Sequence, residues 1–569
     1  MAELSLLIPE NASPVFEKLT KEAINDLSLE YICKSLTESA YEQNVIMKIM
    51  SEITCDEQTV SYRTEIFEDF LRFPELRSAL AELLAELADL REISRFQKDT
   101  EASSLWKLVN RLREIDGYVN CITKMKEVLE RTDIHSQGLL RLKKEVCDIY
   151  SNSGFPQLKI DIAQTFEKVQ KVKSVTIGVN LDDLLRPKNA GIISLNDKAF
   201  TSAGLMKHFM KFANNDDDLH FGTDISDITK FHPASPRIKE GTFSIGSVDP
   251  VSGNGTPNTS ENSLTGADPL SDSLKKAVTS IMKKTVQDIQ SVLTRYVNIS
   301  GYSLSALTPE IIFYIRWAEL VEKIKAKGLD MCKPAIKSPE SRGFSAKGIY
   351  NLKLAIKRVS GEEFNIVAND IDFDDENGRI FILTGPNRGG KTTFTQAVGL
   401  AFLLAQNGIY TPCSACEVSP CDNIFTHFPA DENDTVDLGR LGEESKRLAE
   451  IFDIATSKSL MLLNESLATT NVSEGLFIAK DVVRAMRYLG VRSVFNTHMH
   501  DLAMKLDVLN SEIQGESLVE SLVTGVDKGE RSFKVYKSDP QGSSYARDIA
   551  KKYGVTFEQI KQNIDKSAT

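Results

Sequence analysis

The segment from Gly385 to Thr392 carries the residue types that hold a polyphosphate. It reads Gly385-Pro386-Asn387-Arg388-Gly389-Gly390-Lys391-Thr392, and Thr393 follows. An apolar run precedes the segment and a helical pattern follows it, which is the order of a phosphate-binding loop. In such a loop backbone N–H groups face the phosphates. The Lys391 ammonium reaches the β- and γ-phosphate oxygens, and the Thr392 hydroxyl binds Mg²⁺. The sequence therefore predicts a nucleotide site that takes ATP with Mg²⁺.

A second apolar run, residues 459–463, ends in Asn464 and Glu465. Nucleotide hydrolases place an acidic pair at such a strand end, to hold Mg²⁺ with its water and to position the attacking water. Glu465 is therefore the predicted catalytic carboxylate, and Asn464 takes the Mg²⁺ position without the usual charge. Losing one charge about 5 Å from a dication weakens their attraction by at most several kcal/mol. We predict weaker Mg²⁺ binding or slow turnover, not inactivity.

A third predicted strand, residues 491–496, is followed by Thr497 and His498. A histidine at the carboxyl end of a sheet strand can sense the γ-phosphate or the attacking water. A lone histidine is more often structural. Beside the phosphate loop and Glu465 we assign His498 to the catalytic site, and we leave His500 as a structural residue.

These three segments depend on one kind of scaffold. From about Ser345 onward, short apolar runs alternate with helical patterns, which predicts a parallel sheet with helical crossovers. The phosphate loop, Glu465 and His498 each follow such a run. The chemistry of the chain is therefore concentrated in this α/β part.

The remainder of the chain is predicted to be largely helical. The first 170 or so residues combine polar turns with hardly any β-branched runs. Leucines spaced by four, three, four and three residues run from Leu76 to Leu90, just after Pro74. This seam fits a bundle helix or a short coiled coil.

The pattern changes between residues 173 and 344. Residues 173–180 and 190–195 predict two short strands around a connection that contains Pro187. Residues 214–271 are rich in Asp, Ser, Gly, Asn, Thr and Pro and predict a mobile loop, because they cannot bury enough apolar surface. Helical periodicity returns at 274–297, and a further helix is predicted from Thr308 as its N-cap to Gly328.

Length and composition describe a folded chain of several domains. The 569 residues are 41% hydrophobic and 26% charged, with eight scattered cysteines. We predict a cytoplasmic protein with reduced thiols and no membrane partner, because the sequence has neither a membrane span nor a signal peptide. The 68 basic and 80 acidic residues give a net charge of −12, which disfavours whole-surface binding to nucleic acid but allows a local basic groove or a clamp.

Taken together, these residues resemble the ATPase domain of the MutS family of DNA mismatch repair proteins. The resemblance is carried by TGPNRGGKTT, GIYTPCSACEVSPCDNIFTH, LLNESLATTNVSEGLFIA and FNTHMHDLA, in this order between about residues 365 and 502. The segment SSYARDIAKKYGV near the C-terminus is similar to the closing helix of the family. Generic phosphate-loop proteins do not combine these segments.

The resemblance implies a multidomain fold, in which an all-α helical core and lever region with a small β insertion precedes an α/β P-loop (ABC-like) ATPase domain. On this basis we divide the chain into a helical core over 1–172 and a clamp-like β insertion with a disordered loop over 173–271. Returning lever helices are expected over 272–344, and the ATPase domain with its C-terminal helices over 345–569.

The resemblance also implies a function and its partners. It implies an ATPase that works as a homodimer and binds mismatched or branched double-stranded DNA in mismatch repair or recombination. ATP binding and hydrolysis would gate the clamp, and a repair protein would be a further partner. Ile366 and Val367 align with positions that flank adenine in the family, and Tyr536 is expected to supply a ring face.

The sequence departs from the family pattern at several positions. Asn464 replaces the Walker B aspartate, which implies slow hydrolysis. Residues 466–469 and 441–445 replace a Gly-rich turn and a Ser/Thr-rich signature, which implies altered contacts to the γ-phosphate of the opposite subunit. The helical body begins almost at the first residue, so the resemblance predicts a variant without the mismatch-recognition and connector domains.

Three cysteines and a histidine offer an alternative to this interpretation. Cys413, Cys416, Cys421 and His427 have the residue types of a zinc site. The MutS family has an ordinary loop and strand here, so we predict no metal other than Mg²⁺.

Two functions compete at this point. The first is the ATP-dependent DNA clamp of the MutS type. The alternative is a nucleotide-gated dimeric scaffold that controls a protein partner and has no DNA role, which the net charge of −12 favours slightly.

Overall fold

The computed structural model describes residues 4–84, 105–152, 154–171, 173–181, 183–184, 187–199, 287–289, 291–292, 306–428, 439–467, 472–515, 517–527, 530–539 and 553–561. The chain forms two compact units, one of residues 1–84, 125–145 and 306–569 and the other of residues 85–124 and 146–305. The first N-terminal helices therefore belong to the same unit as the α/β part. The predicted loop at 214–271 and most of the predicted helix at 274–297 lie outside the described residues.

The α/β part is built on a six-stranded sheet with the strand order β10-β11-β12-β8-β13-β14. Its strands are β8 (Ile380–Thr384), β10 (Ile424–His427), β11 (Leu460–Asn464), β12 (Arg492–Asn496), β13 (Val519–Asp527) and β14 (Glu530–Lys537). The strands from β10 to β13 pair in parallel, and β14 pairs antiparallel with β13. The predicted parallel sheet is confirmed. The three predicted strands that precede the phosphate loop, Glu465 and His498 are its neighbouring strands β8, β11 and β12.

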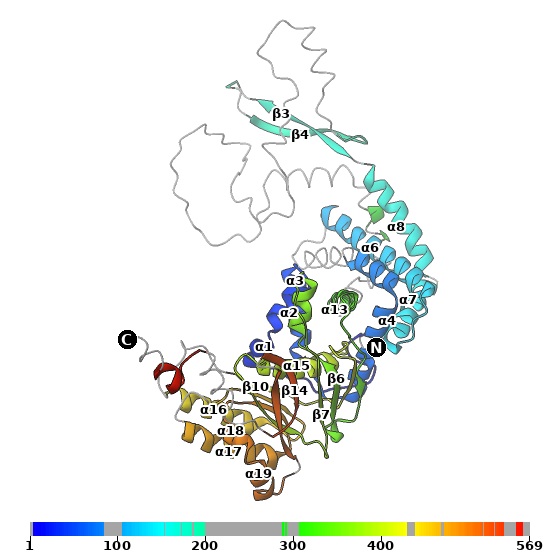
Figure 1. Cartoon of the computed structure of the whole chain (residues 1–569). Helices are drawn as coiled ribbons and strands as arrows, with labels where there is room; N and C mark the ends of the chain where they lie inside the picture. The colour runs from blue at the N-terminus through cyan, green and yellow to red at the C-terminus, as the bar shows by residue number, and fades with distance from the viewer. Residues whose placement is uncertain are drawn as a thin grey trace. The chain divides into compact units, whose positions relative to one another are not determined.

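Helices cover both faces of this sheet. One set of strand residues, which includes Ile382, Leu463 and Phe495, packs with helices on one face. These helices are α16 (Gly439–Ile454), α17 (Val472–Leu489), α18 (His500–Ala503) and α19 (Leu506–Glu512), which gather on one side in Figure 1. Leu462 points to the other face, where α15 (Lys391–Gln406) lies. Burial on both faces is the reason that β8 and β11 are apolar over nearly their whole length.

A second, smaller sheet packs against α15. Its strands are β5 (Ala335–Ile336), β6 (Phe344–Ile349), β7 (Asn369–Phe373) and β9 (Ala415–Val418), in the order β5-β9-β6-β7. Helix α14 (Leu352–Val359) lies between β6 and β7 in the chain. The ring of Phe344 stacks on that of Phe402 in α15, with 4.5 Å between the ring centroids. This sheet therefore fixes the position of the helix that follows the phosphate loop.

Helix α13 (Thr308–Ala326) is buried over most of its length. Phe313, Tyr314 and Trp317 are among its fully buried side chains. The helix contacts α3 (Ala40–Met50) and α4 (Glu57–Arg72). The predicted N-cap was wrong, because Leu307 already has helical φ and ψ angles and the Thr308 hydroxyl is buried inside the first turn. Gly328, with a φ of +74°, follows the helix end as predicted.

The remaining N-terminal elements complete this unit. They are β1 (Glu17–Lys18), α1 (Lys21–Asp26), α2 (Leu29–Leu36) and β2 (Glu52–Ile53), and residues 74–84 form a further helix. Leu76, Leu80 and Leu83 are buried, as the leucine seam predicted, and the rest of the seam lies outside the described residues. Helix α1 contacts β10 of the large sheet.

The other described helices are α6 (Leu105–Arg131), α7 (Gln137–Ser151) and α8 (Gly154–Gln170). The predicted β insertion is confirmed as the antiparallel hairpin of β3 (Ser174–Leu181) and β4 (Pro187–Asn196). Pro187 was placed wrongly in the connection, because it opens β4 opposite Leu181, and the first residue of a strand tolerates proline. Among the described helices, none is both long and apolar enough to cross a membrane.

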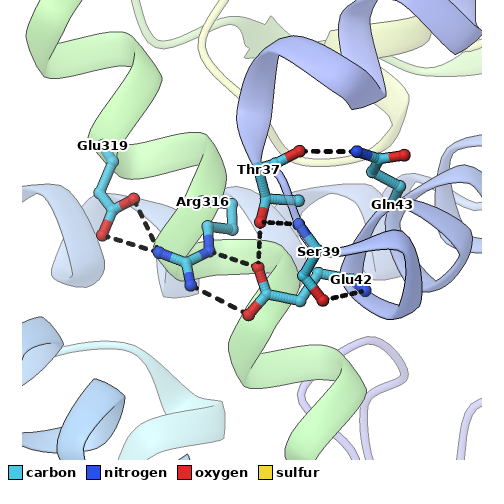
Figure 2. A network of polar contacts seen from close by, with 6 residues as sticks. All are labelled: Thr37, Ser39, Glu42, Gln43, Arg316 and Glu319. Carbon is cyan, nitrogen blue, oxygen red and sulfur yellow. Dashed lines mark hydrogen bonds and ion pairs between the residues drawn. The ribbon is translucent and has the colours of Figure 1, made fainter.

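A polar network ties α3 to α13, as Figure 2 shows. The Arg316 guanidinium donates to both carboxylate oxygens of Glu42, at 2.7 and 2.9 Å, and also to Glu319. Thr37 donates to the same Glu42 carboxylate. Burial alone would raise the pKa of Glu42, but the hydrogen bonds from Arg316 and Thr37 hold this pKa below its ordinary value. The network therefore stabilises the folded state with Glu42 ionised.

We expect Arg316→Ala to lower the free energy of unfolding by about 2 kcal/mol, because a half-buried carboxylate loses its charged donor. Glu42 has a lowered pKa in the folded state, so this stabilisation is present above the ordinary pKa and disappears as the pH falls through the folded pKa. Urea unfolding at neutral pH should therefore give a lower free energy of unfolding for the variant than for the wild type. In acid this difference in free energy should disappear. Lys34→Ala, which breaks an exposed pair with Glu30, is the control and should change nothing measurable. An equal gap at both pH values would contradict the role of Glu42.

Candidate nucleotide-binding and hydrolysis site

The glycines of the loop between β8 and α15 adopt conformations that other residues rarely take. Gly385 has a φ of +138° and Gly390, the N-cap of α15, a φ of +89°. A Cβ atom at Gly385 would overlap the Thr524 hydroxyl of β13, and one at Gly389 would lie 2.8 Å from the Pro386 carbonyl oxygen. The backbone is thus packed closely enough to need glycine, which leaves N–H groups at the helix start open to an anion.

The other loop residues differ in exposure. Asn387 and Arg388 are exposed, and Arg388 has a φ of +58°. Thr392 and Thr393 begin α15 and are partly exposed. The structure therefore places the predicted loop residues as one continuous turn at the carboxyl end of β8.

The Lys391 ammonium is buried in this turn. Its Nζ donates to the carbonyl oxygens of Gly385 and Pro386, at 3.1 and 3.2 Å. Burial lowers the pKa of Lys391, and the Glu465 carboxylate partly opposes this effect. Both hydrogen-bond acceptors are neutral, so the buried cation gains charge compensation when a polyanion enters the loop. This arrangement fits a nucleotide phosphate.

Asn464 lies beside Thr392 at the predicted Mg²⁺ position. The Thr392 hydroxyl donates to Asn464 Oδ1 at 2.8 Å, and Asn496 Nδ2 donates to the same oxygen. Asn464 and Asn496 are direct neighbours in the parallel pairing of β11 and β12. The hydroxyl and amide oxygens are hard ligands that suit Mg²⁺ bound mainly through water and phosphate. Thr392 and Asn464 therefore fit a nucleotide-bound Mg²⁺, with no formal charge from Asn464.

Glu465 and His498 are brought together by the ends of β11 and β12. His498 Nε2 lies 2.9 Å from Glu465 Oε1, and each side chain is a little more than one-third exposed. The Glu465 backbone N–H donates to the Asn496 carbonyl oxygen at 2.8 Å. The arrangement gives a carboxylate next to the phosphate loop, oriented by a ring nitrogen and open to solvent. Chemically it can accept a proton from a water molecule.

The turn after Glu465 is held from several directions. Glu465 and Leu467 have φ angles of +53° and +64°, in the left-handed region. The Leu467 N–H donates to Glu444 Oε2 of α16 at 2.6 Å. His427, at the end of β10, lies with Nδ1 2.7 Å from the Ser466 hydroxyl. Burial and the nearby Arg447 cation lower the pKa of His427 to about 4, so its ring is neutral at neutral pH.

The two residues predicted to flank adenine precede a residue that is bonded to β14. Ile366 and Val367 are half-buried just before β7. The Asn369 side chain, two residues later, bonds the backbone of β14 at the Phe533 carbonyl oxygen and the Val535 N–H. These bonds bring the segment close to β14.

Two aromatic rings of β14, those of Tyr536 and Phe533, take different positions. Tyr536 is exposed and its ring lies over Gly525 of β13. Phe533 lies beside the loop, with its Cδ1 atom 3.3 Å from the Cβ position of Gly390. Phe533 has a φ of +56°, so a bulge in β14 turns its ring toward the phosphate loop. Sequence reasoning missed Phe533, because a bulge breaks the alternation of strand side chains.

Two cysteines of the alternative zinc site have partners outside that site. Cys413 Sγ lies 3.5 Å from Cys332 Sγ, and Cys421 Sγ donates to Gln406 Oε1. The His427 ring contacts Ser466 instead of a thiol. In the part of the chain that the structure describes, no group of three or more His, Cys, Asp or Glu residues is arranged to hold a metal ion.

Sequence reasoning also missed Asn496, Ser466 and Thr524. Asn496 stands directly before Thr497 and His498 in the sequence, so its place at a strand end was a usable signal. Ser466 follows Glu465, but its contact with His427 depends on the pairing of β10 with β11. Thr524 comes from β13, which has no motif of its own. Only the strand order places it against the loop.

Comparison with known proteins gives matches in both parts of the chain. The family model of MutS domain V matches residues 381–563, and that of the MutS2 N-terminal domain matches residues 55–327. The DNA mismatch repair protein MutS of Chlorobium phaeobacteroides is 32% identical over 208 residues, which are 36% of this chain and 23% of that protein.

Two further relatives have the same name. DNA mismatch repair protein MutS of Chlorobium limicola is 36% identical over 149 residues, 26% of this chain and 17% of that protein. The protein of Dehalococcoides mccartyi is 34% identical over 203 residues, 35% of this chain and 23% of that protein. The matching part of the chain thus spans less than a quarter of the length of these three relatives. The two family models do not overlap, and domain V covers the phosphate loop, Glu465 and His498. Over residues 55–327 and 381–563 the chain is therefore similar to proteins of the MutS family.

Proposed function

We propose that this protein binds ATP with Mg²⁺ in the loop from Gly385 to Thr392, hydrolyses it slowly, and uses this cycle to control binding to DNA. The observation that carries the proposal is the convergence of three strand ends. The loop after β8, Asn464 and Glu465 after β11, and His498 after β12 come from neighbouring parallel strands. The relatives named as DNA mismatch repair proteins support the DNA part.

Each residue has a distinct task in this proposal. Lys391 compensates the charge of the phosphates. The Thr392 hydroxyl and Asn464 Oδ1 would help to hold Mg²⁺ and its bound water. When bound, Mg²⁺ polarises the terminal phosphate and stabilises charge in the transition state. Glu465 accepts the proton of the attacking water, and His498 holds the carboxylate through the contact at 2.9 Å.

Asn464→Asp is expected to lower the Mg²⁺ concentration needed for half-maximal hydrolysis by about tenfold and to raise the rate. Aspartate keeps the shape and the acceptor oxygen for Thr392 and Asn496, and it adds the missing charge. Steady-state phosphate release over a range of Mg²⁺ concentrations measures both effects. Asn44→Asp, on an exposed face of α3, adds the same charge elsewhere and is the control. An unchanged Mg²⁺ dependence would remove Asn464 from the metal position.

The DNA part of the proposal is tested by filter binding. Mismatched, branched and fully paired duplexes are titrated at several salt concentrations, with and without ATP. We expect ATP-dependent affinity with a salt slope, because each phosphate contact releases counterions. Retained ATP binding without affinity for any duplex would contradict the DNA role and favour the nucleotide-gated scaffold.

The proposal includes a homodimer whose ATP sites gate a clamp. A probe at Ile193, which is exposed on β4, marks the hairpin in each protomer. We expect the distance between two probes to change when ATP and Mg²⁺ are added to Glu465→Gln protein. A near-complete switch needs about 5.5 kcal/mol of preference of ATP for one state. A protein that stays monomeric with ATP, or an unchanged distance, would contradict the clamp and leave the ATP site standing.

A further inference from the structure

The three residues from Glu465 to Leu467 form a constrained turn. Glu465 and Leu467 both have left-handed φ angles, +53° and +64°, which residues with side chains rarely adopt. Such conformations persist only where the surrounding structure holds them, and they cluster at functional sites. The question is which contacts hold this turn.

Each residue of the turn is held by a different element. Glu465 donates its N–H to the Asn496 carbonyl oxygen at the end of β12, and Leu467 donates its N–H to the Glu444 carboxylate on α16. Between them, Ser466 is bonded to His427 at the end of β10, by both the ring and the backbone. His427 therefore reaches the one residue of the turn that lies next to the predicted catalytic carboxylate.

The hydrogen positions of this contact can be assigned. The Ser466 hydroxyl donates its single hydrogen to the His427 carbonyl oxygen, at 2.9 Å. The ring contact of 2.7 Å must then run in the other direction, so His427 Nδ1–H donates to Ser466 Oγ. The two residues thus form a reciprocal pair, which orients both the ring and the serine side chain.

The pair is closed off from water. His427 and Ser466 are each 1% exposed, so no solvent molecule replaces a bond that is lost. Arg447 of α16 is the charged group that acts on the ring, and it lies 3.7 Å from Asp26 at the end of α1. The backbone of Glu444 also contacts the ring. Burial and Arg447 disfavour a charged ring, so His427 serves as a neutral donor.

We propose that His427 is a positioning residue for Glu465, which acts through Ser466 to hold the turn in the conformation that aims the carboxylate at the attacking water. His427 itself does not touch the nucleotide. The inference rests on the proposed hydrolysis of ATP and adds to it a residue that was considered above only as a zinc ligand. It also predicts that Ser466 and His427 act as one unit.

The test is a set of four variants. His427→Leu removes the ring donor, Ser466→Ala removes its acceptor, and the double variant removes both. His427→Asn keeps an N–H donor close to the Nδ1 position and is the conservative control. We expect kcat for ATP to fall about tenfold to a hundredfold in His427→Leu and in Ser466→Ala, because small misplacements of a catalytic group are costly. The Kd for ATP should stay unchanged, and His427→Asn should restore most of kcat.

The double variant decides whether the two residues act together. Its kcat should equal that of His427→Leu and of Ser466→Ala. Either substitution alone already breaks the contact between the two residues, so the second one has nothing further to remove. Multiplied effects of the two substitutions would overturn the proposal, as would unchanged kcat in His427→Leu. A Kd for ATP that rises by the same factor as kcat falls would also overturn the proposal. His427 would then support the whole nucleotide site and not Glu465 in particular.

A second measurement does not depend on turnover. Hydrogen exchange of peptides over residues 460–467 should be about tenfold faster in His427→Leu and unchanged in His427→Asn, since local opening frees the amides of the turn. Peptides of β6 serve as the internal reference, and faster exchange there as well would indicate general loosening and overturn the inference. If the wild-type protein hydrolyses no ATP, the proposed hydrolysis fails, and this exchange experiment alone decides the positioning role.

Discussion

ATP binding is expected to be lost in Lys391→Ala, with the Kd for ATP raised about a hundredfold or more. A hydrogen bond to a charged group in a site closed to water contributes about 3 kcal/mol, and Lys391 is the buried cation of the loop. Titration with a fluorescent ATP analogue measures the change directly. Wild-type affinity in the variant would remove Lys391 from the site.

The folded state should not suffer from the same substitution. Burial already disfavours the charged form of Lys391, and its hydrogen bonds go to two neutral carbonyl oxygens. Thermal unfolding of Lys391→Ala without nucleotide should therefore match the wild type or lie above it. Only the wild type should gain stability from added ATP, because ligand binding stabilises the state that binds it. Lys48→Ala, on an exposed position of α3, is the control for both measurements.

Glu465→Gln is expected to bind ATP as tightly as the wild type and to lower the turnover number by about a hundredfold or more. Glutamine keeps the size and the contact distance to His498, but it cannot accept a proton from water. Among the residues that the structure describes at the ends of β11 and β12, Glu465 is the only acid, because Asn464 and Asn496 occupy the neighbouring positions. Single-turnover phosphate release separates this chemical step from binding.

Glu474→Gln, on an exposed position of α17, is the matched control and should turn over at the wild-type rate. Unchanged turnover in Glu465→Gln would move the catalytic role to another residue. A weaker Kd for ATP in the same variant would show that Glu465 helps to bind the nucleotide, and it would contradict the assignment of the carboxylate to the water.

The sequence by itself identified the residues of the site that belong to local motifs. The loop from Gly385 to Thr392, Glu465 and His498 each follow a strand that is buried throughout, and the structure places these strands side by side. Local patterns were sufficient here, because the carboxyl ends of parallel strands lie at one edge of a sheet. The antiparallel hairpin of β3 and β4 was found in the same way, from two runs separated by a polar connection.

The tertiary structure decided the contacts that join segments distant in the sequence. The pair His427 and Ser466 depends on β10 lying next to β11, and Phe533 reaches the loop only through a bulge in β14. No periodicity encodes such contacts, because strand order and bulges are set by packing between elements and not by the residues of one element. The sequence therefore determined which residues are able to carry out the chemistry, and the fold determined which residues hold them in place.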